Sequence, residues 1–207
     1  DLARLIALLH DIGRFEQLKR YDSFEPGTMD HAAYGVKVLF DEGMIRRFLP
    51  DDKWDSIIYT AIAHHSDYEL PEISDPQTLL HAKLIRDEDK LDNCRVKLVD
   101  STSTFINVSE EELGTQNITQ KVYETVFKNK CILSADRVTQ MDYWVSYIVY
   151  FFDINFKESF DIIAENDYLN RIIDRIPYSN PVTKEQMENI RVYMQNFINS
   201  HTNSQSF

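Results

Sequence analysis

The feature that most constrains this chain is the helical spacing of its apolar residues, which recurs along most of the sequence. In the first segment the apolar side chains return with the period of an amphipathic helix, at Leu2, Leu5, Ile6, Leu8 and Leu9. No segment shows the sustained alternation that a half-buried strand requires. We therefore predict an all-α protein, a compact helical bundle of about eight to ten helices.

Turn-forming residues divide the chain into these predicted helices. Loops are expected at 22–28 and 68–76, where Ser, Pro, Gly and acidic residues gather, and 102–114 is irregular by pattern. Asp30 is placed to cap a helix that ends at Gly43. The other predicted helices cover residues 50–64, 77–91, 116–128, 141–152, 156–164, 167–176 and 183–200.

Charge and length limit the classes of function. The chain has 207 residues, enough for a large core, and its formal net charge is −12. Such an acidic balance argues against a nucleic-acid partner, because binding along a phosphate backbone needs positive charge. It does not exclude a small phosphorylated ligand, since bound metal ions would reverse the local field.

Cysteine content and hydropathy bear on the compartment. Cys94 and Cys131 provide neither a disulfide framework nor metal-ligand spacing, which favours a reducing, cytoplasmic setting. The longest apolar run, 144–152, is interrupted by Ser146 and is too short to cross a bilayer. We predict that this aromatic run is a core helix and that the protein has no membrane partner.

Histidine and aspartate interrupt the apolar pattern at the ends of predicted helices. One end of a bundle can therefore gather four sets of side chains, which are His10-Asp11, Asp30-His31, His64-His65 and Asp89. Burying an imidazole and a carboxylate without a partner would cost several kcal/mol, whereas a divalent metal supplies the partner. Imidazole and carboxylate suit transition metals better than Ca²⁺, and so many ligands favour a two-metal site.

The order of these motifs resembles the HD-domain superfamily of metal-dependent phosphohydrolases, over about residues 1–100. The resemblance implies one HD-type domain over 1–207, with 1–100 as the metal-site core and 101–207 as a helical part that completes the fold and pocket. The double histidine is similar to that of members with several metals, including the HD-GYP group. The Gly-Tyr-Pro hallmark is absent after His65, so cyclic-di-GMP is not implied.

The resemblance implies a role for each matching residue. The metal ligands would be His10, Asp11, His31, His64 and Asp89, while His65 would be a further ligand or a contact of the substrate phosphate. Asp11 would bridge two ions. Arg14 and Lys90 would meet the charge that develops on the phosphoryl oxygens, as catalytic and substrate-binding residues beside Asp11.

The implied cofactor is a divalent transition metal, one or two per chain: Mn, Fe, Co, Ni or Zn, with Mg possible. The implied reaction is cleavage of a phosphate ester or anhydride in a small, nucleotide-like substrate by metal-activated water. Two alternatives remain open, a di-iron oxygenase of the same fold and a degenerate module that senses a nucleotide. The sequence does not indicate an oligomeric state.

The chain departs from the family pattern at one point. The family opens with a further histidine on an upstream helix, and residues 1–9 contain none. Because the sequence starts at Asp1 without a methionine, we expect this histidine to precede it; the alternative is an incomplete site.

Simpler roles compete with these assignments. His10-Asp11 can cap a helix, His31 can lie on the surface, and one of the two adjacent histidines at 64 and 65 can be structural. Asp87 and Asp92 rival Asp89 by spacing. Arg14 and Lys90 can be solvated charges, the usual state of such residues.

Overall fold

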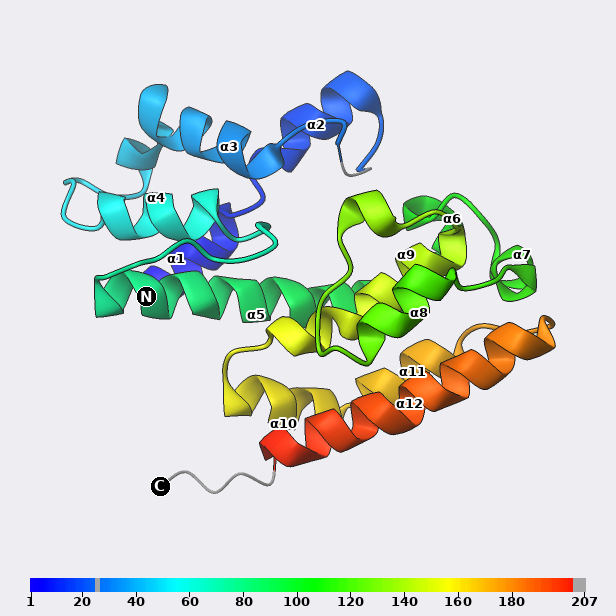
Figure 1. Ribbon diagram of the computed structural model, residues 1–207. Helices are drawn as coiled ribbons and strands as arrows, with labels where there is room; N and C mark the ends of the chain where they lie inside the picture. The colour runs from blue at the N-terminus through cyan, green and yellow to red at the C-terminus, as the bar shows by residue number, and fades with distance from the viewer. Residues whose placement is uncertain (25–26, 203–207) are drawn as a thin grey trace. The chain divides into compact units, whose positions relative to one another are not determined.

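A computed structural model describes residues 1–24 and 27–202, and every regular element in those residues is a helix (Figure 1). The predicted all-α class is confirmed. The chain divides into two compact units, Asp1–Asp89 and Lys90–Phe207, each described here by itself. None of the helices in these ranges combines the length and apolar character needed to cross a membrane. That both units form a single HD-type domain stays a prediction.

The described residues of the first unit, 1–24 and 27–89, form six helical elements and the first part of a long seventh. They are α1 (Leu2–Leu9), α2 (Arg14–Tyr21), α3 (His31–Val36), the π-helix η1 (Lys37–Asp41), the 3₁₀ helix η2 (Met44–Arg47), α4 (Asp55–Ala63) and α5 (Pro76–Val99). Helices α3 and α4 lie side by side (Figure 1). The core between these helices includes Ile6, Leu39, Ile58 and Ile62, all at most 1 % exposed. Each such side chain stabilises the fold by about 1.5–3 kcal/mol.

The predicted start of α3 is confirmed, whereas its predicted end is wrong. Asp30 caps α3 as predicted, since its side chain accepts a hydrogen bond from the Ala33 amide at 2.9 Å. The helix does not continue regularly to Gly43, because it widens into the π-helix η1 after Val36. Of the predicted loop 22–28, residues 25 and 26 lie outside the described residues.

Gly13 brings the start of α3 against the turn that follows α1. Its φ of −68° is ordinary, so the backbone conformation itself does not require glycine. A Cβ there would lie 2.0 Å from the carbonyl oxygen of His31 and 3.0 Å from the amide nitrogen of Gly35. The missing side chain therefore permits the close approach that carries His31 towards Asp11.

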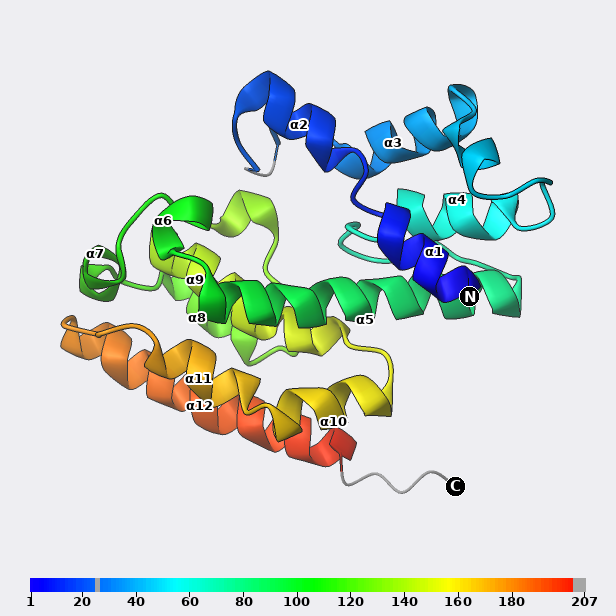
Figure 2. The ribbon, with the colours of Figure 1, turned by 180° about the vertical axis from the view of Figure 1, so that it is seen from behind.

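The second unit begins within α5 and continues through nine elements. They are α6 (Thr102–Phe105), α7 (Glu110–Thr115), α8 (Gln120–Val126), the 3₁₀ helix η3 (Ser134–Asp136), α9 (Gln140–Ile148), the 3₁₀ helix η4 (Val149–Asp153), α10 (Lys157–Glu165), α11 (Tyr168–Asp174) and α12 (Pro181–Thr202). Helix α12 packs along α10 and α11 (Figure 2). Trp144 and Phe151 are at most 1 % exposed, which confirms the aromatic run as core.

Helix boundaries in this unit differ from the prediction. The segment 102–114 contains α6 and α7, and the Ser109 side chain accepts a hydrogen bond from the Glu112 amide to cap α7. Helix α12 begins at Pro181, because Asn180 caps it through the amides of residues 182 and 183. Helix α5 runs on to Val99 through the acidic stretch that was predicted to end it.

Candidate metal centre

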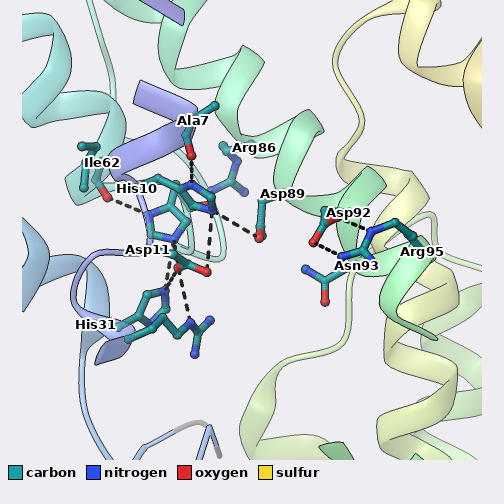
Figure 3. A network of polar contacts seen from close by, with 12 residues as sticks. Ala7, His10, Asp11, His31, Ile62, Arg86, Asp89, Asp92, Asn93 and Arg95 are labelled. Atoms are coloured by element: carbon teal, nitrogen blue, oxygen red, sulfur yellow. Dashed lines mark hydrogen bonds and ion pairs between the residues drawn. The ribbon is translucent and has the colours of Figure 1, made fainter. Parts of the chain in front are cut away.

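His10 directly follows α1, and its ring is fixed by a bond to the backbone. Nδ1 donates a hydrogen bond to the carbonyl oxygen of Ala7 at 2.8 Å, which leaves Nε2 as the acceptor nitrogen. Nε2 lies 3.7 Å from Oδ2 of Asp11 and 3.8 Å from Oδ1 of Asp89 (Figure 3). The backbone bond thus selects the tautomer that can bind a metal through Nε2.

His65 follows α4 and is held in the same way. Its Nδ1 donates to the carbonyl oxygen of Ile62 at 2.7 Å, and the residue is 2 % exposed. Its Nε2 lies 3.5 Å from Oδ1 of Asp11 and 3.0 Å from Nε2 of His31. His31, the first residue of α3, places Nε2 3.3 Å from the same Asp11 oxygen. Both rings are therefore buried with a ring nitrogen directed at one carboxylate.

The two oxygens of Asp11 face different partners. Oδ1 faces His31 and His65, whereas Oδ2 faces His10, which in turn approaches Asp89. Potential ligand atoms of His10, Asp11 and His65 all lie within 4.8 Å of one another. Imidazole nitrogen and carboxylate oxygen are donors that divalent transition metals bind, so these three residues could hold one such ion.

The cluster keeps its carboxylates ionised. Burial alone raises the pKa of Asp11, but interactions with His31 and His65 outweigh it and hold the pKa well below its usual range. Burial also opposes the charged form of Asp89, yet the interaction with His10 lowers the pKa of Asp89 below its ordinary value. Both groups are negatively charged at neutral pH, the form in which a carboxylate binds a metal.

The pKa of His10 is shifted in the opposite direction, above its ordinary value. Burial alone lowers the pKa of His10, but the contact with Asp89 and the charge of Asp11 outweigh it and raise the pKa. The two carboxylates thus attract positive charge to the His10 position, whether a proton or a metal ion carries it.

Arg14, at the start of α2, lies beside the cluster. Its Nε donates to Oδ1 of Asp11 at 3.3 Å, and its Nη1 donates to Oε1 of Gln17 at 3.2 Å. The side chain is 31 % exposed, so solvent reaches part of it. A cation stands next to the candidate ligands and is accessible to an anionic substrate.

Among the described residues, the ion-pair partners of Asp11 include His31 and His65 but not His64. His64 Nδ1 donates to Oδ2 of Asp67 at 2.6 Å, with a third of its side chain exposed. Lys90 belongs to the second unit, where its Nζ forms an ion pair with Oδ2 of Asp153 at 2.7 Å. Their proposed roles as ligand and phosphate contact gain no support from these positions.

Of the two predicted rivals of Asp89, Asp92 is engaged on its own helix. Its Oδ1 accepts a hydrogen bond from Arg95 Nε at 2.7 Å, while Asp89 turns towards His10 (Figure 3).

Arg86 supports the centre and was not identified from the sequence. It is 2 % exposed, and its Nη1 donates to the carbonyl oxygens of His64, His65 and Asp67 at 3.0, 3.3 and 2.7 Å. It therefore ties the end of α4, which carries His65, to α5, which carries Asp89. Its position one helical turn before Asp89 was the available signal, but it lies in a charged run that resembles a solvated surface.

Comparison with known families agrees with this geometry. The family model described as HD domain matches residues 1–94. Residues 1–94, just under half of the chain, are thus similar to the HD domain. The superfamily consists in general of metal-dependent phosphohydrolases, and HD domains bind divalent metals. No curated protein and no solved structure matches the chain.

Proposed function

We propose that this HD domain is a metal-dependent phosphohydrolase that cleaves a phosphate ester or anhydride in a nucleotide-like substrate. The observation that carries the proposal is the convergence of three imidazoles and two carboxylates, four of them at helix ends and Asp89 within α5, with an accessible arginine bonded to one carboxylate. Donors alone would suit many metal proteins. The adjacent cation favours an anionic substrate.

The protein's own residues would divide the work at this centre. His10, Asp11, His31, His65 and Asp89 would hold one or two divalent ions. Bound there, such an ion would polarise a phosphoryl oxygen and lower the pKa of water to near neutrality. Arg14 would bind and orient the phosphate, and its charge would stabilise the negative charge that builds in the transition state.

The proposed substrate class depends on the net charge of the chain as well as on its candidate metal ligands. The chain carries a net charge of −12, so a polyanionic macromolecule would be repelled away from the metal centre. A small phosphorylated molecule reaches the centre without contacting much of that surface. We therefore propose a nucleotide-sized substrate and no nucleic acid.

The test is phosphate release by the purified protein after removal of metals and reloading with Mn²⁺, Fe²⁺, Co²⁺, Ni²⁺, Zn²⁺ or Mg²⁺. A generic ester, 4-nitrophenyl phosphate, is assayed first, followed by nucleoside mono-, di- and triphosphates. Metal-dependent release that is lost in Asp11→Asn is the expected result. Oxygen consumption by the iron-loaded protein with no phosphate release from any of these compounds would favour the oxygenase and overturn the proposal.

A further inference from the structure

Gln17 is an unusual residue in the helix that carries Arg14. Helix α2 is polar, and Gln17 is its single buried residue, at 1 % exposure. Burying a primary amide is costly unless both its carbonyl and its amino group are hydrogen-bonded. An aliphatic residue of similar size would fill this space without that cost, and what the amide adds is directional hydrogen bonds.

Both ends of the Gln17 amide are engaged. Oε1 accepts from Nη1 of Arg14 at 3.2 Å, and Nε2 donates to Oγ1 of Thr28 at 2.8 Å. Arg14 in turn donates from Nε to Oδ1 of Asp11 at 3.3 Å. A chain of hydrogen bonds therefore runs from Thr28, two residues before the cap of α3, through Gln17 and Arg14 to the candidate metal centre.

This chain fixes the direction of the Arg14 guanidinium. The group is planar and its five N–H donors have a fixed arrangement, so bonds at Nε and Nη1 determine where Nη2 points. In the described part of the protein, Nη2 of Arg14 has no hydrogen-bond partner, and the side chain is 31 % exposed. An arginine held at two nitrogens thus keeps its third nitrogen available beside the Asp11 carboxylate.

We infer that Gln17 is a positioning residue, which holds Arg14 so that Nη2 meets an oxygen of the substrate phosphate at the metal centre. The inference rests on the proposed function, since it needs a phosphate to be bound there. Gln17 itself contacts neither substrate nor metal. Its contribution is to keep Arg14 from turning into solvent or folding onto Asp11 with both amino groups.

The test combines Gln17→Met, which keeps the length of the side chain but removes the amide, with Arg14→Ala and the double variant. Readouts are metal content, kcat/KM for 4-nitrophenyl phosphate, and the affinity of the metal-loaded protein for inorganic phosphate by calorimetry. Gln17→Met should keep its metal and lose about tenfold in kcat/KM and in phosphate affinity, because a misplaced group costs one to two orders of magnitude. In the Arg14→Ala background it should cause no further loss.

Two further variants separate positioning from folding. Gln17→Glu retains an acceptor for Arg14 and should keep most of the phosphate affinity. This variant still tests the inference if Gln17→Met does not fold. Gln195→Met is the matched control and should change nothing, since this half-buried glutamine on α12 donates its hydrogen bond to Asn199, within the same helix.

An equal loss from Gln17→Met with and without Arg14 would overturn the inference, since Gln17 would then act on the fold alone. Failure of the proposed function gives a different result, in which the wild type releases no phosphate with any metal. Phosphate affinity of the metal-loaded protein then still decides whether Gln17 acts through Arg14.

Discussion

Gly13→Ala should disrupt the metal centre although residue 13 is no ligand. Its Cβ would lie 2.0 Å from the His31 carbonyl oxygen, which belongs to the backbone and has no rotamer to change. An ordinary carbon–oxygen contact of about 3.4 Å requires the two segments to separate by about 1.4 Å. Metal ligands tolerate about 0.2 Å, so His31 would leave its place near Asp11.

The expected magnitudes follow from this displacement. Overpacking of this kind costs about 1–3 kcal/mol, against a gain of about 0.4–1 kcal/mol when alanine replaces glycine without strain. We therefore expect a lower free energy of unfolding and a decrease in Tm of about 5 °C. Loss of one ligand should weaken metal binding by at least about 10–100-fold.

Gly35→Ala is the matched control at the same interface. Its Cβ would meet the Ile12 side chain at 3.4 Å, an atom that can shift, and lies 3.8 Å from the His10 carbonyl oxygen. This variant should keep both its metal and its Tm. The assay is metal content by elemental analysis with thermal unfolding of both variants. Equal metal content in the Gly13→Ala and Gly35→Ala proteins would refute the reasoning, because the close approach would then not position His31.

Three further results are expected. Arg86→Met should lower the free energy of unfolding in urea by about 3 kcal/mol and weaken metal binding, because it leaves three backbone carbonyls after α4 without their donor. Unchanged metal affinity would mean that Arg86 does not position His65. His65→Ala should lose metal while His64→Ala keeps it, since Asp67 engages the His64 ring; elemental analysis showing the reverse would exchange their roles. In chelator-treated protein, the raised pKa of His10 contributes stability that is present below about pH 6.5 and is lost as pH rises through the folded-state pKa. The free energy of unfolding in urea should therefore decrease from pH 6 to pH 8.5, and His10→Gln should make this decrease smaller.

The helical class could be predicted because burial repeats the same spacing in helix after helix. The length of α5 could not. Its charged residues look like a helix end, but Arg86 binds backbone carbonyls and Lys90 binds Asp153, and such partners are distant in sequence. The pattern of neighbouring residues in the sequence does not reveal these distant contacts.

Most of the candidate ligands could be predicted because polar residues at helix ends stand out against an apolar pattern. Which of His64 and His65 faces Asp11 could not, since neighbouring residues point about 100° apart and the phase depends on how α4 ends. His65 is turned inward by its bond to Ile62, and His64 is held by Asp67. In the sequence, Gly13 indicates no more than a turn after His10-Asp11, whereas its function depends on an approach to α3 that only the fold reveals.

The central claim is that His10, Asp11, His31, His65 and Asp89 form one metal centre. Its most direct test is the transition-metal content of the purified protein and of Asp11→Asn after identical loading and removal of free ions. Asp11 contacts three of the histidines, so the account predicts one or two ions per wild-type chain and essentially none in the variant. Equal metal content in the two proteins, or none in the wild type under any loading condition, would contradict it.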